Sequence, residues 1–282
     1  MNIFTLLLTQ PLANGLVLFY KVLGENMGLA IIGFSLLLRV ILTPLTKPYL
    51  ESMKKMREVA PQLEKLKQKH KGDKTKLMKA QADFYKEKGI NPSAGCLPQI
   101  LQIIVLIALY NVFTKALVDG GIVTNNFNSL LYAPLKFIEG AKINTQFLYL
   151  NISKPDVINV GLPFSLPGPI LILAALSQMI SAKIAAPYLE LEEKMAAKTP
   201  KKEDDFQVAM QNSAIYTFPL MTILIGVRFP SGLALYWLLF SLFQTLQQYR
   251  STGLGGLTPW LKRLNLLKLP HNDKKSRKSK NN

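Results

Sequence analysis

Five apolar blocks, separated by charged segments, decide what this chain of 282 residues can fold into. Each block approaches the roughly 17–25 apolar residues that a helix needs to span a bilayer. One such block also suits a buried helix of a soluble protein, but five in one chain favour a membrane protein. We therefore predict an all-α polytopic membrane protein with five transmembrane helices, at residues 27–48, 97–118, 169–187, 213–228 and 231–249.

The charge of the chain is strongly basic and unevenly placed. A net charge of +17 beside 49% hydrophobic residues suits a membrane protein with basic cytoplasmic parts; a soluble RNA-binding protein would explain the charge but not the apolar blocks. Residues 51–90 hold twelve Lys or Arg and six Asp or Glu. Residues 250–282 hold nine Lys or Arg and one Asp, whereas residues 115–168 hold only four Lys.

The positive-inside rule turns this distribution into a topology. The two basic regions should be cytoplasmic, and the loop at 119–168 and the N-terminus should be external. The loop at 188–212 becomes cytoplasmic by parity alone, because residues 187–212 carry four Lys against six acids.

Three segments outside the spans have patterns of their own. We predict that residues 1–26 form an external helix in the membrane interface, with a sixth span as the alternative. Residues 49–90 should form a cytoplasmic helical hairpin, in which Gly72 can end the first helix and Asp73 can cap the second. The basic cytoplasmic tail at 250–282 should begin as an interfacial helix and end in disorder. Residues at helical spacing form narrow, largely apolar stripes that indicate the two hairpin helices: Met53, Met56, Ala60, Leu63 and Leu66, then Leu77, Gln81, Phe84 and Lys88 with Ala80 beside them.

Arg39 stands inside the apolar run GFSLLLRVILTPL. A charge at the centre of a spanning helix costs about 2.5–3.5 kcal/mol on insertion scales. The spans contain no Asp or Glu to pair with it. Polar side chains and water can solvate it instead, which predicts a water-filled cavity inside the bundle. Two alternatives stay open: Arg39 can snorkel to the interface, and any single Gln or Ser in a span can simply bond a neighbouring helix.

The sequence carries no recognisable catalytic motif. Its only cysteine is Cys96, and its two histidines, His70 and His271, lie in basic polar surroundings. HExxH, G-x-S-x-G and P-loop motifs are absent from the sequence. We therefore expect no enzyme activity, no cofactor and no metal. The N-terminal stretch lacks a basic n-region, so we expect it to remain in the mature protein.

Three separated motifs give the chain a specific resemblance. They are RVILTPLTKPYLESMKKMREVAPQLEKLKQKHKGDK, FYKEKGINPSAGCLPQILQ and FPSGLALYWLLFSLFQTLQQY, in this order. With them the chain resembles the YidC/Oxa/Alb family of membrane protein insertases, from about Gln10 to Tyr249. We expect it to depart from many members by lacking a large periplasmic domain and a lipid-anchored cysteine, and by a longer external loop.

The resemblance implies a hydrophilic groove that is open to the cytoplasm and to lipid but closed outside. This groove would receive the hydrophilic flank of a nascent membrane protein and would need no nucleotide hydrolysis. The groove arginine of the family corresponds to Arg39. The candidate groove residues are Arg39, Gln102, Asn111, Gln178, Ser181, Tyr216, Trp237, Ser241 and Gln244. The hairpin would recruit substrate, with candidate residues Lys54, Lys55, Arg57, Lys65 and Lys67.

The implied partners are nascent membrane proteins and membrane lipids, with the ribosome, the signal recognition machinery and the Sec translocon as further candidates. The implied location is the bacterial plasma (inner) membrane, and we expect a monomer. Two other functions remain as alternatives. A small-solute transporter or channel usually needs an intramembrane acid, which is missing from the spans. A chaperone that acts only after insertion by other machinery would use the same groove and hairpin.

Overall fold

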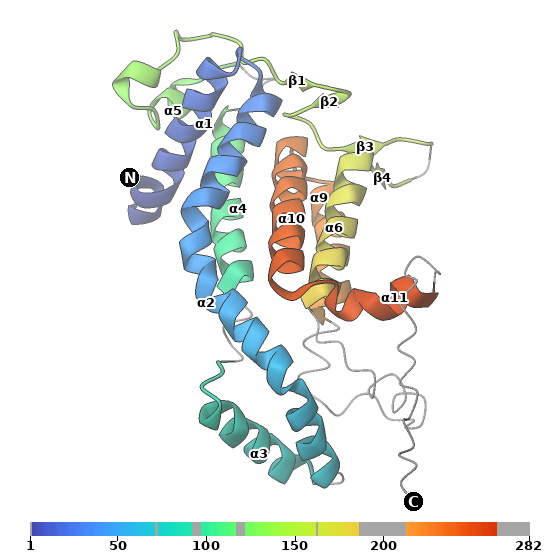
Figure 1. The fold of residues 1–282 in the computed structure, drawn as a ribbon. Coiled ribbons are helices and arrows are strands. Elements are labelled where there is room, and N and C mark those ends of the chain that lie inside the picture. Colours follow the sequence, from blue (N-terminus) through green and yellow to red (C-terminus); the bar gives the residue numbers. More distant parts are fainter. Residues whose placement is uncertain are drawn as a thin grey trace, which may run out of the picture.

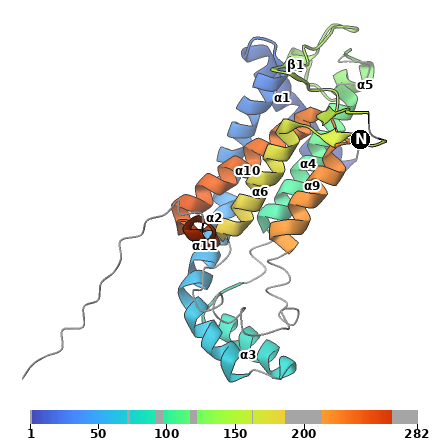
Figure 2. The same cartoon turned by 90° about the vertical axis from the view of Figure 1, so that its right-hand side faces the viewer.

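A computed structural model shows the protein, and it describes residues 2–70, 73–91, 97–116, 122–161, 163–185 and 213–263. Helices pack side by side into an elongated bundle (Figures 1 and 2). The bundle carries a small cap, residues 122–168, at one end and a helical hairpin at the other. The bundle helices are α1 (Gln10–Val22), α2 (Met27–Lys69), α4 (Leu97–Ala116), α6 (Pro169–Ala185), α9 (Phe218–Gly226) and α10 (Ser231–Thr252). Single π-helical turns, Thr5–Thr9 and Ser213–Thr217, precede α1 and α9.

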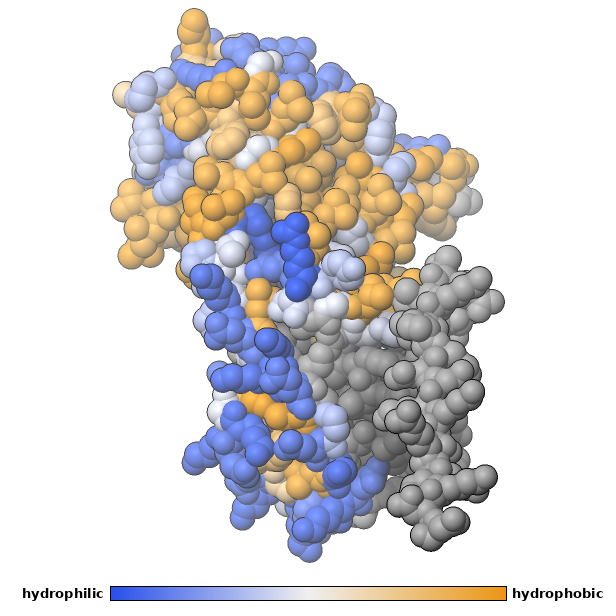
Figure 3. All heavy atoms as spheres, in the orientation of Figure 1, coloured by the Kyte–Doolittle hydropathy of each residue, from blue (hydrophilic) through white to orange (hydrophobic). Residues whose placement is uncertain are grey.

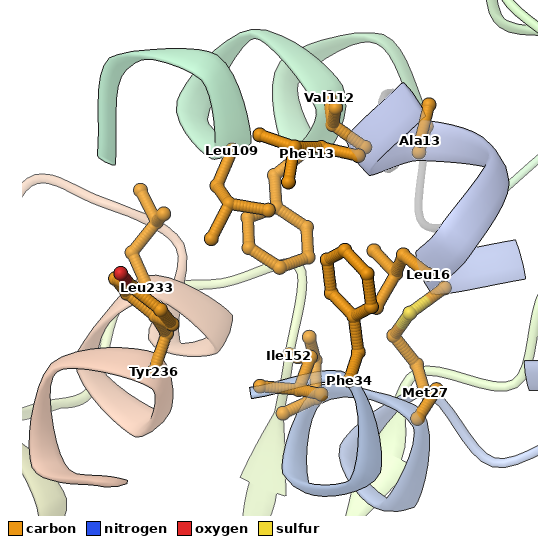
Figure 4. Close-up of a cluster of buried hydrophobic side chains, with 14 of the residues drawn as sticks. Ala13, Leu16, Met27, Phe34, Leu109, Val112, Phe113, Ile152, Leu233 and Tyr236 are labelled. Atoms are coloured by element: carbon orange, nitrogen blue, oxygen red, sulfur yellow. The ribbon is translucent and has the colours of Figure 1, made fainter. Parts of the chain in front are cut away.

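The main hydrophobic core lies toward the cap end of this bundle. Leu16 of α1, Phe34 of α2, Phe113 of α4 and Leu233 of α10 all point into it (Figure 4). Ile152 of the cap completes the cluster and is fully buried. The core therefore holds α1, α2, α4, α10 and the cap together as one unit.

Two of the described helices are long and apolar enough to cross a membrane, Met27–Met56 and Gln99–Ala116. Two shorter apolar helices, Pro169–Ala185 and Ile215–Gly226, lie beside them in the bundle. The mostly helical fold fits the predicted all-α membrane class, while the number of spans stays a prediction.

The hairpin of α2 and α3 (Lys74–Glu87) projects beyond the bundle (Figures 1 and 2). The predicted first span and the first hairpin helix form one continuous helix, α2. The predicted cap at Asp73 is confirmed, because its Oδ1 accepts the Lys76 backbone N–H at 3.0 Å. This hydrogen bond holds the pKa of the Asp73 carboxyl below its usual range. Gly72 lies outside the described residues.

A small apolar cluster of its own closes the hairpin. Leu63 of α2 meets Tyr85 of α3 and Ile90, and Met56, Val59, Leu66 and Phe84 pack around them. The cluster is separate from the main core. The stability of the hairpin should therefore be local, and separable from that of the bundle.

We expect Leu63→Ala to loosen the hairpin alone. Removing this buried side chain should cost about 2 kcal/mol, which lowers the hydrogen-exchange protection of α3 amides by about 30-fold. Exchange in α4 and α10 should not change. Met78→Ala is the matched control, because Met78 lies on α3 with its side chain exposed. Equal loss of protection in both variants would show that the cluster does not hold the hairpin.

The loop between α4 and α6 folds into a cap, which we define as residues 122–168. It contains α5 (Asn125–Asn128), a 3-10 turn (Ala133–Leu135) and two antiparallel pairs of short strands. Strand β1 (Gln146–Phe147) pairs with β2 (Leu150–Asn151), and β3 (Val157–Ile158) pairs with β4 (Leu166–Pro167). The cap buries Val123, Phe127, Leu130, Ile143 and Ile152 in the main core.

Asn14 joins the cap to α1. This residue is buried; its amide donates to the Leu130 carbonyl at 2.9 Å and accepts the Tyr132 backbone N–H at 2.7 Å. The Tyr20 hydroxyl accepts the Asn144 backbone N–H at 2.9 Å. Helix α1 lies along α2 and α4 (Figure 1). Its predicted place in the membrane interface stays a prediction.

Asp156 joins the cap to α6. Its side chain is buried, and Oδ2 accepts the Leu171 backbone N–H at 2.9 Å in the first turn of α6. Oδ1 accepts the Tyr149 hydroxyl at 3.1 Å, and the same hydroxyl accepts the Ile170 N–H at 3.0 Å. A carboxylate at this end of a helix satisfies free N–H groups and faces the positive end of the helix dipole.

Candidate functional site

The guanidinium of Arg39 lies between α2 and α10. Arg39 is half-buried and donates a hydrogen bond from Nη2 to Oε1 of Gln247. Its Cζ atom lies 5.2 Å from the centre of the Phe240 ring, a cation–π distance. Among the described residues, no carboxylate forms an ion pair with Arg39. The positive charge is therefore held by a neutral amide and a ring face.

Two tyrosines complete the surroundings of Arg39. Tyr49 and Tyr236 lie within electrostatic range of the guanidinium, and both side chains are buried. The Tyr49 hydroxyl accepts a hydrogen bond from Nε2 of Gln248 at 3.1 Å. The Tyr236 hydroxyl finds no hydrogen-bond partner among the described residues. Water or a bound polar chain can supply the hydrogen-bond partner that this buried hydroxyl lacks. We call Arg39, Tyr49, Tyr236, Phe240 and Gln247 the Arg39 cluster.

A second polar layer connects α10 with α6. Oε1 of Gln248 accepts the Ser181 hydroxyl at 2.8 Å while its Nε2 bonds Tyr49, so one amide links α6, α10 and α2. Gln178 of α6 accepts the Thr222 hydroxyl of α9 at 2.8 Å. For Gln178 and Ser181 the structure thus shows hydrogen bonds between helices, the alternative that the sequence left open.

The other predicted groove residues are spread over the bundle. Gln102 is buried on α4, Asn111 and Gln244 are half-buried, and Tyr216 is 50% exposed before α9. These positions do not contact Arg39 in any interaction seen among the described residues.

Two predicted residues of α10, Trp237 and Ser241, make no contact with Arg39 in the interactions seen among the described residues. Trp237 is buried in the main core, with its ring 6.4 Å from that of Phe229. Ser241 is buried and donates to the carbonyl of Trp237, in its own helix, at 2.7 Å. The residues that do meet Arg39, Tyr236 and Phe240, each stand one position earlier. Sequence reasoning missed them, although Tyr236, Phe240 and Gln247 are spaced for one helix face.

The predicted recruiting residues lie on the hairpin. Lys54, Lys55 and Lys65 are exposed, whereas the side chains of Arg57 and Lys67 lie outside the described residues. The hairpin is mainly hydrophilic on the face shown in Figure 3, below a hydrophobic belt around the bundle. Hydrophilic atoms also gather where α2 and α10 meet, at the lower border of this belt (Figure 3). Within the described ranges, no group of three or more His, Cys, Asp or Glu residues forms a candidate metal site.

Apolar helices packed into a bundle are the features of a helical membrane protein. Comparison with known proteins agrees. The family described as 60Kd inner membrane protein matches residues 18–253. The membrane protein insertase YidC of Fusobacterium nucleatum is 31% identical over 86% of this chain and 94% of its own length. The chain therefore belongs to the 60Kd inner membrane protein family, a family of bacterial cell-membrane proteins that includes the YidC insertases.

Other relatives are longer or match over a shorter stretch. The YidC insertase of Pelobacter propionicus is 30% identical over 86% of this chain but only 38% of its own length. That of Caulobacter vibrioides is 45% identical over 38% of this chain and 17% of its own length. This chain therefore matches only a part of these longer relatives.

Proposed function

We propose that the protein inserts nascent integral membrane proteins into the bilayer and helps them fold. The observation that carries this proposal is the half-buried guanidinium of Arg39, which no described carboxylate neutralises. An acidic or polar flank of a substrate can approach this charge without displacing a resident partner. The relatives named as membrane protein insertases support the proposal.

The mechanism needs a polar path and a driving force. A hydrophilic groove around the Arg39 cluster, open to the cytoplasm and to lipid, shortens the dry distance that a polar flank must cross. The transfer of the substrate's apolar segment into lipid then supplies about 0.8 kcal/mol per buried CH₂ group, so nucleotide hydrolysis is not required. The fourth apolar block of the sequence, residues 213–228, would form a helix of only about 24 Å, shorter than the roughly 30 Å hydrocarbon core. Such a short helix favours local thinning of the bilayer.

The proposed topology follows the charge distribution, and the proposed partners follow the family resemblance. We place the N-terminus and the cap outside, and the hairpin and the basic tail in the cytoplasm, with five spans between them. The exposed Lys54, Lys55 and Lys65 would recruit substrate. The ribosome, the signal recognition machinery and the Sec translocon are the further partners that we propose for a monomeric protein.

The test is insertion into liposomes that contain the purified protein and no Sec components. The substrate is a single-span protein with a short acidic N-terminal tail, and protection of this tail from external protease is scored. We expect protection well above that in empty liposomes. If the protein binds the substrate, keeps it soluble and leaves the tail digestible, it acts as a chaperone and the insertase proposal is wrong.

A further inference from the structure

The hairpin of β3 and β4 is an apolar projection beside the cap end of α6 (Figure 1). Residues 157–168 include no charged side chain. Ile158, Val160 and Phe164 are 45%, 53% and 61% exposed, although all three are large and apolar. Exposed apolar side chains gathered on one projection are typical of a contact with a membrane or another protein.

The distance along α6 between Pro169 and Lys183 indicates where this hairpin lies in the bilayer. At the other end of α6, Nζ of Lys183 lies 4.7 Å from the centre of the Trp260 ring in α11 (Thr258–Arg263). Tryptophan is enriched at membrane–water interfaces and lysine at the cytoplasmic ends of spans, so we place the interface at this pair. Pro169, the first residue of α6, stands 14 residues earlier, or about 21 Å away at 1.5 Å per residue. A hydrocarbon core of about 30 Å therefore extends about 9 Å beyond the start of α6.

The hairpin starts at that point and continues the apolar surface of the helices. β4 ends at Pro167, and only Gly168 separates it from α6. Below it, large apolar side chains are exposed along α6 and α9: Ile172, Leu173, Leu176, Ile180, Leu220, Met221, Leu224 and Ile225. The hydrophobic belt in Figure 3 reaches the edge of the molecule where the hairpin projects. This continuity favours lipid, rather than a protein, as the occupant.

The hairpin is also built for a water-poor environment. Its two strands pair with each other at Val157–Pro167 and Ile158–Leu166. The Ser165 hydroxyl donates to Oδ1 of Asn159 at 2.7 Å, which satisfies the hydroxyl donor and one amide acceptor within the hairpin. Internal hydrogen bonds lower the cost of leaving water. Asp156 fixes the hairpin to α6, because its carbonyl accepts the Gly168 N–H at 2.8 Å and its carboxylate accepts the Leu171 N–H.

We infer that the β3–β4 hairpin is a membrane anchor, which places Ile158, Val160 and Phe164 in the lipid interface of the cap-side leaflet. It completes the short span of α6 and holds this leaflet close to the bundle. The anchor is a property of the membrane-embedded chain and does not depend on the proposed insertase function.

The test measures the depth of spin labels on the full chain in lipid vesicles. One label is attached through Phe164→Cys and a control label through Ile138→Cys, both in a Cys96→Ser background. Ile138 is 86% exposed and lies in the cap between Lys136 and Glu139. We expect the label at 164 to collide several-fold more with oxygen than with a water-soluble nickel complex, and the label at 138 to show the reverse.

Two results would overturn the inference. A label at 164 that meets the nickel complex as often as the label at 138 would place the hairpin in water. A label shielded from both oxygen and nickel would indicate a protein contact. Thermal unfolding of each labelled protein confirms that it is folded, and no substrate is added, so failure of insertion cannot affect the result.

Discussion

Arg39→Glu is expected to abolish insertion of a substrate with an acidic tail, Arg39→Ala to slow it about a hundredfold, and Arg39→Lys to retain part of the activity. At an effective dielectric constant of about 20, a carboxylate about 5 Å from the guanidinium gains about 3 kcal/mol. Each 1.4 kcal/mol corresponds to about tenfold in rate, which gives the expected loss for Ala. Lysine keeps the charge but loses the planar contacts with Gln247 and Phe240. The measurement is the initial rate of tail protection in proteoliposomes.

A matched variant separates the charge from its support. Gln247→Leu removes the amide that holds the guanidinium but leaves the charge in place, so it should reduce the rate by only a few-fold. Equal rates for the Lys, Ala and Glu variants of Arg39 would leave snorkelling or packing as its role.

Asp156→Ala is expected to give the largest loss of stability. It removes the acceptor for the Leu171 N–H and the Tyr149 hydroxyl, and it leaves the first turn of α6 without a carboxylate. Hydrogen bonds to a charged group contribute about 1.5–3 kcal/mol each and the helix dipole about 0.5 kcal/mol, so we expect a net loss of about 3 kcal/mol. In a chain of this size that lowers Tm by about 6–10 °C, measured by thermal unfolding in nanodiscs.

Two further variants serve as an intermediate case and a control for this prediction. Asp156→Asn keeps an acceptor oxygen and should lose about half as much stability. Asp83→Asn changes an exposed carboxyl on α3 and should leave Tm unchanged. If Asp156→Ala unfolds at the same temperature as Asp83→Asn, the junction between cap and α6 does not depend on this carboxylate.

The α2–α3 hairpin and the unusual position of Arg39 could be predicted from the sequence for a simple reason. Apolar residues three or four apart define a helix face without any knowledge of the rest of the fold. The stripe predicted Leu63, Leu66 and Phe84 in the hairpin contact, and the cluster there confirms them. Arg39 stood out because its charge contrasts with every neighbour in its apolar run.

The residues that surround Arg39 could not be predicted from the sequence, because they depend on the rotation of α10 about its own axis. That rotation is set by packing: a Cβ at Gly232 would lie 2.8 Å from Ile152 Cγ2 and 3.1 Å from Ile31 Cδ1. This close approach turns Tyr236 and Phe240 toward α2, and Ser241 out of contact with Arg39. The cap was also missed, because strands of two residues carry no periodic pattern. The sequence does not distinguish Asp156 from other acidic loop residues, because only the fold places it at the start of α6.

The most direct test of the central claim is photo-crosslinking from the Arg39 cluster to the substrate tail during insertion. A photoreactive amino acid replaces Gln247 beside Arg39, and a control replaces Leu242, which is exposed on the apolar surface of α10. This role of Arg39 predicts crosslinks from position 247 to the acidic tail, which weaken in an Arg39→Ala background, and crosslinks from position 242 to the apolar segment alone. Tail crosslinks that are equally frequent at both positions, or unchanged without Arg39, would contradict it.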